Sequence, residues 1–293
     1  MKKQSLLPLL ALAGGAAAFV LRLLQNRTGF EAATGLPVPG NVPGLALIVL
    51  LAVLALAFLL LVRRLPGEAS PGPAFPEEFA AGNTGLLFLP VAGALLMALS
   101  GLADLAESLS GVNLLARLQA AADPYGAMAE EVSGFAARAQ LLLALLALAS
   151  GAAVFLAAAA CRRGNREVGA SFQTVLLLVP PVALVVRLVL TYRLDSIDPA
   201  LEAYYVELLA LVFLTLAFYR LSSFAFQSGQ TRRFALYACG AVVLCIAALA
   251  DGGPHLSSLL LYAGGAAALL GFLLLRLVHV PGNSETHDTT SET

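Results

Sequence analysis

The chain has 293 residues, of which 59% are hydrophobic and only 12% are charged. Soluble domains carry about 25% charged residues, so this composition excludes an ordinary soluble protein and indicates an all-α, polytopic integral membrane protein. The 17 lysines and arginines against 18 acids give a net charge of -1, which provides no basic field for nucleic acid. Eight spans of about 20 residues would leave loops too short for a soluble catalytic domain.

Eight apolar runs predict transmembrane helices. In chain order they cover residues 5–24, 43–62, 85–104, 139–161, 172–192, 201–220, 234–250 and 256–275. Each can cross about 30 Å of hydrocarbon as a helix, which satisfies its own backbone hydrogen bonds. We therefore expect residues 1–280 to form one helical domain. Residues 281–293 are polar and lack apolar periodicity, which predicts a disordered cytoplasmic tail.

The first run has a second interpretation. Lys2 and Lys3 precede an apolar stretch and small residues, a layout that secretory signal peptides share. Cleavage after Ala18 would leave seven helices with the N-terminus outside. The apolar run continues through Val20 and Leu21, past that site, and this favours an uncleaved first helix.

The basic residues test the number of crossings, because cytoplasmic loops carry the excess of lysine and arginine. With eight crossings, 11 of the 17 fall on one side: Lys2, Lys3, Arg63, Arg64, Arg162, Arg163, Arg166, Arg220, Arg232, Arg233 and Arg276. The other six are Arg22, Arg27, Arg117, Arg138, Arg187 and Arg193. This segregation predicts a plasma-membrane protein with both termini in the cytoplasm.

Two connections are longer than the others. Residues 63–84 are rich in proline and glycine, which predicts an irregular cytoplasmic strap with no core of its own. Residues 105–138 form the largest outside segment. Within it, Asn113 can cap a short helix that ends near Ala122 and lies on the membrane surface or over the mouth of the bundle.

Signatures of metal or cofactor chemistry are missing from the sequence. We find no zinc, phosphate-binding, dinucleotide-binding or hydrolase motif. The three histidines are scattered at positions 255, 279 and 287, and the three cysteines at 161, 239 and 245 have no paired spacing. We therefore expect no metal, no cofactor and no catalytic residue.

Two charged residues lie inside predicted spans. Arg187 and Glu207 are each ten residues from Ile197, the middle of the turn between two helices, so both are expected at one depth and in contact. A charge at membrane depth persists only when it is paired, hydrated or used. The pair is therefore either a structural lock between these helices or a substrate or proton site.

Two further features accompany this pair. Pro180 and Pro181 fall near the middle of the span 172–192, where they predict a kink or break of the kind that lines binding sites in transporters. Acids also gather near the outer ends of the spans: Asp104, Glu107, Asp195, Asp198, Glu202 and Asp251. They form either an acidic rim that attracts cations or amines, or simply solvated helix ends.

These features lead to three functional hypotheses. The first is a small permease, or the membrane subunit of a transport system, whose pathway uses the outer halves of the spans 85–104, 172–192, 201–220 and 234–250 and carries a small molecule or cation. The second is a non-transporting sensor, scaffold or assembly partner whose polar pairs hold the bundle together. The third is an intramembrane enzyme, for which Asp104 and Glu107 are the acids at suitable spacing. In each case the lipid bilayer is the expected partner.

Overall fold

The computed structural model describes residues 6–30, 38, 40–65, 75–82, 84–109, 126–163, 176–195, 201–251 and 256–279. These residues are largely helical and contain no β-strand. Each of the eight apolar runs corresponds to one helix: α1 (Leu6–Thr28), α2 (Val42–Val62), α4 (Phe88–Leu109), α6 (Gly126–Arg163), α8 (Val179–Asp195), α9 (Leu201–Ala225), α10 (Thr231–Ala248) and α11 (Leu256–His279). The predicted helical membrane bundle is confirmed.

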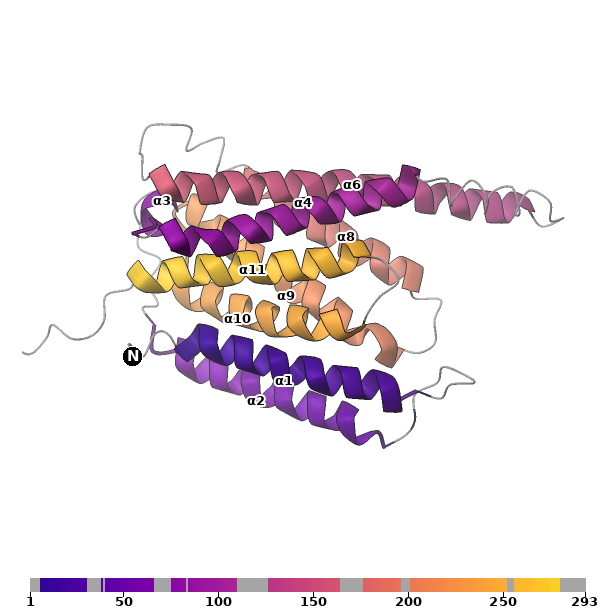
Figure 1. Ribbon diagram of the computed structural model, residues 1–293, viewed down its shortest axis with the longest axis horizontal. Coiled ribbons are helices and arrows are strands. Elements are labelled where there is room, and N and C mark those ends of the chain that lie inside the picture. The colour runs from indigo at the N-terminus through magenta and orange to yellow at the C-terminus, as the bar shows by residue number, and fades with distance from the viewer. Residues whose placement is uncertain are drawn as a thin grey trace, which may run out of the picture.

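Seven of these helices are long and apolar enough to cross a membrane, and α8 is a shorter apolar helix. Three short elements complete the described structure: α3 (Phe75–Glu78), η2 (Thr84–Leu87) and η3 (Leu249–Asp251). The 38 residues of α6 make it about 57 Å long at 1.5 Å per residue, well beyond the roughly 30 Å hydrocarbon layer. Its N-terminal part extends past the ends of its neighbours (Figure 1).

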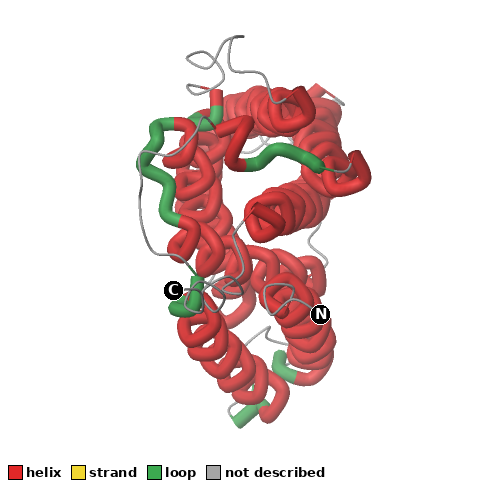
Figure 2. The backbone as a smooth tube through the Cα atoms, turned by 90° about the vertical axis from the view of Figure 1, so that its left-hand side faces the viewer, coloured by secondary structure: helices red, strands yellow, loops and turns green. Residues whose placement is uncertain are grey.

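The long helices run side by side along the longest axis of the molecule (Figure 1). Six of them form a ring in which each contacts the next, in the order α4, α6, α8, α9, α10, α11 and back to α4. The hairpin of α1 and α2 packs outside this ring, with α1 against α10 (Figure 1; Figure 2 gives the view along the helices). Because α2 is apolar on all sides and mostly exposed, it fits the edge of a bundle that faces lipid.

Close packing around α4 depends on small residues. Gly93 of α4 lies against Gly264 and Ala268 of α11, where an added Cβ would come within 2.4 Å of backbone atoms. On the other side of α4, a Cβ added to Gly151 of α6 would come within 2.7 Å of the Ala98 backbone nitrogen. Small residues at such crossings let helix backbones touch in a membrane, where lipid supplies no hydrophobic drive for helices to associate. The helices α6, α4 and α11 therefore form a tightly packed unit.

The two ends of the bundle differ, and we name them by one residue each. The Asp251 end holds the C-terminal residues of α4, α8 and η3, and the Phe79 end holds the beginning of α1 and the end of α11 (Figure 1). The first described helix thus begins, and the last one ends, on the same side, as eight crossings require.

Part of the connection 63–84 is more ordered than the sequence predicted. Phe75 and Phe79, at and just after α3, are buried among the ends of the helices. The Phe79 ring packs edge-on against Phe224, Phe234 and Phe272, with centroids 5.2 to 6.1 Å apart. The expectation of a strap without a core is therefore wrong for residues 75–82, because two phenylalanines four residues apart place their rings on one face.

Two other sequence predictions are refined, and three are not tested. Helix α6 begins at Gly126 instead of near residue 139, so the outside segment is more helical than predicted. Helix α8 begins at Val179, later than the predicted 172. The surface helix at 113–122, the tail at 281–293 and the cleavage question at the N-terminus are not settled, since the first two lie outside the described residues.

The aromatic cluster at the Phe79 end yields a stability prediction. Phe79→Ala should lower the free energy of unfolding by about 3 to 5 kcal/mol, because it leaves a cavity among four rings. Phe88→Ala is the matched control, since Phe88 is 72% exposed, and it should change stability by less than about 0.5 kcal/mol. Thermal unfolding in detergent measures both. Equal melting temperatures for the two variants would show that residues 75–82 do not dock as described.

Candidate functional site

Arg187 lies at the centre of a buried polar cluster between α8, α4 and α11. Its Nη1 is 3.4 Å from Asp104 Oδ2, and its Nη2 donates a hydrogen bond of 3.0 Å to the Ser258 hydroxyl. The two charged side chains are only 10% and 8% exposed. Charge-assisted hydrogen bonds usually measure about 2.7 to 2.9 Å, so the contact with Asp104 is a long one. The two side chains therefore neutralise each other's charge, but the distance between them is longer than in the tightest ion pairs.

The structure gives Arg187 a different partner from the one predicted. We expected a direct contact with Glu207, but the acid at ion-pair distance is Asp104 on α4. Glu207 instead accepts a 2.7 Å hydrogen bond from the Tyr262 hydroxyl. Arg187 and Glu207 both act electrostatically on Tyr262, so they belong to one neighbourhood. Equal depth placed them close together, but the ring order of the helices decides which acid Arg187 reaches.

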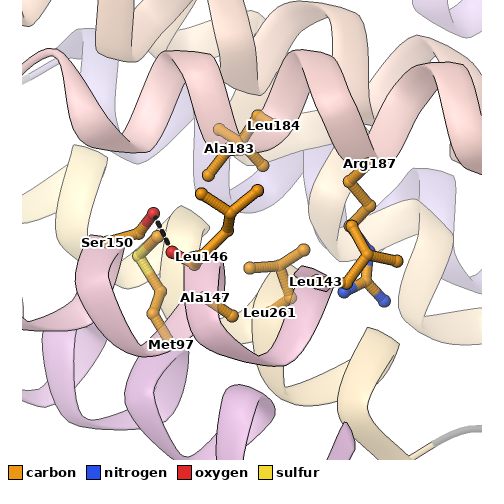
Figure 3. Close-up of a pocket in the computed structure, with 9 residues that line it drawn as sticks. All are labelled: Met97, Leu143, Leu146, Ala147, Ser150, Ala183, Leu184, Arg187 and Leu261. Atoms are coloured by element: carbon orange, nitrogen blue, oxygen red, sulfur yellow. Dashed lines mark hydrogen bonds between the residues drawn. The ribbon is translucent and has the colours of Figure 1, made fainter. Parts of the chain in front are cut away.

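A cavity lies next to this cluster, inside the ring (Figure 3). It has room for about one water molecule. Arg187 lies at one end and Ser150 at the other (Figure 3). The remaining lining is apolar: Met97, Leu143, Leu146, Ala147, Ala183, Leu184 and Leu261. The Ser150 hydroxyl donates a hydrogen bond to the Leu146 carbonyl of its own helix. Arg187 is the one charged residue among the described residues that line the cavity.

The helices around the cavity differ in part from the predicted pathway. Its walls come from α4, α6, α8 and α11. The sequence had indicated the spans of α4, α8, α9 and α10. Leu143, Leu146, Ala147 and Ser150 share one face of α6 at helical spacing, yet that face has no charge that would have marked it. Hydropathy alone therefore missed half of the wall.

Pro180 and Pro181 come directly after an interruption of helical structure, because Leu176 is helical, residues 177–178 form a turn and α8 begins at Val179. They are the second and third residues of α8, and the Val182 amide donates to the Leu178 carbonyl. Amides in the first turn have no acceptor within the helix, so proline removes nothing there. The interruption lies inside the predicted span, immediately before the prolines. The prolines lie at the start of α8, from which Ala183, Leu184 and Arg187 reach the cavity within two turns.

A second buried arginine was not recognised in the sequence. Arg22 of α1 is completely buried, and its Nε lies 2.5 Å from Asp251 Oδ1 in η3. Its Nη1 donates to the Gln25 side chain at 2.9 Å, and its guanidinium lies 5.3 Å from the Tyr205 ring centroid. Asn26 also donates to Asp251, at 3.0 Å. These contacts attach the α1–α2 hairpin to the ring.

The sequence does contain a signal for this second cluster. Arg22, Gln25 and Asn26 are three and four residues apart, which places three polar side chains on one face of α1 immediately after its apolar core. A helix that ended there in solvent would need no such alignment. The identity of the partner, Asp251, depends on the packing of α1 against α10 and is not visible in the sequence.

The predicted outer acids have different surroundings. Asp104 and Asp251 are engaged by Arg187 and Arg22, and Glu107 accepts a 3.1 Å hydrogen bond from Gln140. Asp195 ends α8 and Glu202 lies in the first turn of α9, but their side chains are outside the described residues, as is Asp198. At least two of the six acids are therefore neutralised by arginine. This weakens the argument that an acidic rim selects cations.

A third charged contact lies at the Phe79 end. Arg276 Nη1 is 3.6 Å from Glu78 Oε2, and Arg276 Nε donates to the Thr231 hydroxyl at 3.0 Å. Burial raises the pKa of Glu78, and the charge of Arg276 opposes that rise. The Arg276 guanidinium also lies 5.3 Å from the Phe224 ring centroid. This contact thus fastens the segment 75–82 to α10 and α11.

No group of three or more metal-ligating side chains occurs among the described residues. Cys161, Cys239 and Cys245 are buried and reduced, and they pack as small apolar groups. The cluster around Arg187 can therefore bind through charge and hydrogen bonds, and the neighbouring cavity adds apolar contact.

The Arg22 cluster predicts a large loss of stability on mutation. Arg22→Leu should cost about 3 to 5 kcal/mol, because it leaves Asp251 buried without its cation. Arg22→Leu combined with Asp251→Leu should recover much of that loss, since both charges are then gone. Arg27→Leu is the control on the same helix, because Arg27 is exposed. The assay is thermal unfolding in detergent. An Arg22→Leu protein with the same melting temperature as the control would refute the Arg22–Asp251 pair.

Comparison with known proteins adds no family to this description. The chain matches no protein-family model, no curated protein and no solved structure. The functional argument therefore depends on the buried charges and on the cavity beside them.

Proposed function

We propose that this membrane protein is a small permease, or the membrane subunit of a transport system, whose binding site is the Arg187 cluster and the cavity beside it. The observation that supports this most directly is the position of Arg187, a buried arginine that lines an internal cavity of the helix ring. Ionisable groups that face the interior of a membrane bundle commonly mark substrate or ion pathways. The long contact with Asp104 leaves the guanidinium able to exchange partners.

The cavity has room for about one water molecule in this structure, so a substrate can enter only after it widens. A pathway through it would pass between α4 and α8, since the charged pair joins these helices. Opening there exposes Arg187, Asp104 and the Ser258 hydroxyl together. A substrate is then a small molecule with at least one charged group.

The second candidate is a non-transporting scaffold or sensor. One observation favours it: the cavity has room for about one water molecule, and the charges beside it are already paired. In that case the Arg187 cluster is a structural lock, like the Arg22 cluster. An intramembrane enzyme has less support, because Asp104 binds Arg187 while Glu107 binds Gln140, so the two acids do not act as one pair.

A release assay separates the two main candidates. Liposomes that contain the purified protein are loaded with a mixture of small amino acids, monocarboxylates and monoamines, and mass spectrometry follows what is lost. A permease should release at least one class faster than protein-free liposomes do. The double variant Arg187→Gln with Asp104→Asn buries no net charge and should stay folded, yet it should lose this release. Arg27→Gln should behave as the wild type, and a protein that releases none of the three classes would support the scaffold.

We also propose that the protein resides in the plasma membrane with both termini in the cytoplasm. The Phe79 end carries the helix-flanking arginines Arg63, Arg64, Arg162, Arg163, Arg220, Arg232 and Arg233, and the positive-inside rule places such an end in the cytoplasm.

Reporter fusions test this orientation. A phosphatase that works only outside the cytoplasm should be inactive after residue 280 and active after residue 120, in the segment between α4 and α6. The opposite pattern would reverse the orientation. Activity at both positions would contradict eight crossings.

A further inference from the structure

We propose that the Arg187 site binds a zwitterion with a small aliphatic group, of which an α-amino acid with an aliphatic side chain is the simplest example. This inference rests on the proposed function, because it names the substrate class of the same site. It follows from three observations: the charge balance of the pair, the polar groups around it, and the apolar cavity beside it.

The first observation concerns net charge. Arg187 and Asp104 are buried and together carry no net charge. A simple anion that bound Arg187 in place of Asp104 would leave Asp104 buried without a cation. A simple amine that bound Asp104 in place of Arg187 would leave Arg187 buried without an anion. Either outcome is costly in a medium of low dielectric. A zwitterion satisfies both charges at once, so its carboxylate can bind Arg187 while its ammonium group binds Asp104.

The second observation is that the site has polar groups beyond the ion pair. Ser258 already contacts Arg187, and Tyr262, one turn further along α11, binds Glu207. The Ser100 hydroxyl is completely buried and has no hydrogen-bond partner among the described residues. Buried hydroxyls are normally bonded, and an unmade bond has an energetic cost.

The position of Ser100 connects it to the site. It lies four residues before Asp104 and three after Met97, so all three residues share one face of α4. Met97 lines the cavity and Asp104 binds Arg187. The unsatisfied hydroxyl is thus between the apolar and the charged part of the site, where a ligand's ammonium or carboxylate group would supply the missing bond.

The third observation gives the shape of the ligand. Arg187 is at one end of the cavity, and aliphatic side chains and the Met97 thioether form most of its wall (Figure 3). A ligand whose two charges lie at one end and whose aliphatic group lies at the other matches this arrangement. Ala147 and Ala183 are the small residues of the wall, where a few methyl groups can enter once α4 and α8 separate.

Three ligands with the same aliphatic group test the proposal. L-leucine carries both charges, isopentylamine keeps only the ammonium group, and isocaproate keeps only the carboxylate. Binding to the full-length protein in detergent is measured by calorimetry and by the shift in melting temperature. We expect leucine to bind at least about tenfold more tightly than either analogue, because each analogue leaves one buried charge unpaired.

Two variants make the test specific. In Asp104→Asn the negative charge is replaced by a neutral amide, so the affinity for leucine should fall by about tenfold or more while the affinity for isocaproate rises. In Arg187→Gln the preference should move to isopentylamine for the converse reason. Such an exchange of preference cannot result from loss of folding, and the melting temperature without ligand is recorded for each variant. Arg27→Gln should keep the wild-type order of affinities.

The outcomes distinguish this inference from the proposed function. If the wild type prefers the amine or the acid, or if release from liposomes is confined to one of those classes, the permease stands and the zwitterion is refuted. If no ligand binds and none of the three classes is released, both proposals fail. Binding of leucine without release would support the site in a sensor and refute transport.

Discussion

The structure depends on the cost of placing charge at membrane depth. Arg22, Arg187, Asp104 and Asp251 are all largely shielded from solvent, and each arginine has an acid from a distant part of the chain. A lone buried charge would be strongly unfavourable, so each pairing determines which helices must be neighbours. Arg22 fixes α1 to η3 at the end of α10, and Arg187 fixes α8 to α4. The ring and its attached hairpin are the arrangement that satisfies both pairs.

The sequence predicted the helices well and their contacts poorly. All eight spans were found because the requirement behind them is local: a backbone in hydrocarbon must bond to itself over about 20 residues. The acid bound to Arg187 was not found, because the sequence constrains depth but leaves the order around the ring undetermined. Asp104 was expected near the outer end of its span, and its contact with Arg187 depends on the position of α4 between α6 and α11.

The composition of a segment is a poor guide to its local structure where a few side chains decide that structure. The segment 63–84 looks like a loop because proline and glycine dominate it, yet Phe75 and Phe79 are buried in the aromatic cluster. Pro180 and Pro181 predicted an interruption of the span 172–192, and the structure has a turn at residues 177–178, just before α8 begins at Val179. In both places the spacing of a few side chains, or the tolerance of a first turn for proline, decides the local structure.

The two arginine clusters are built differently, and this difference indicates where motion can occur. Arg22 has an aspartate, a glutamine and an aromatic ring around it, and its own side chain is completely buried. Arg187 has one long contact with an acid and one hydroxyl, and a cavity lies beside it. Backbone contacts at Gly93 and Gly151 hold α4 against α11 and α6, so α4 cannot leave its neighbours without breaking close packing. Helix α8 lacks such a constraint toward α4, since it packs against α6 and α9. Any opening of the site therefore separates α8 from α4, and this separation breaks the Arg187–Asp104 contact and widens the cavity in one movement.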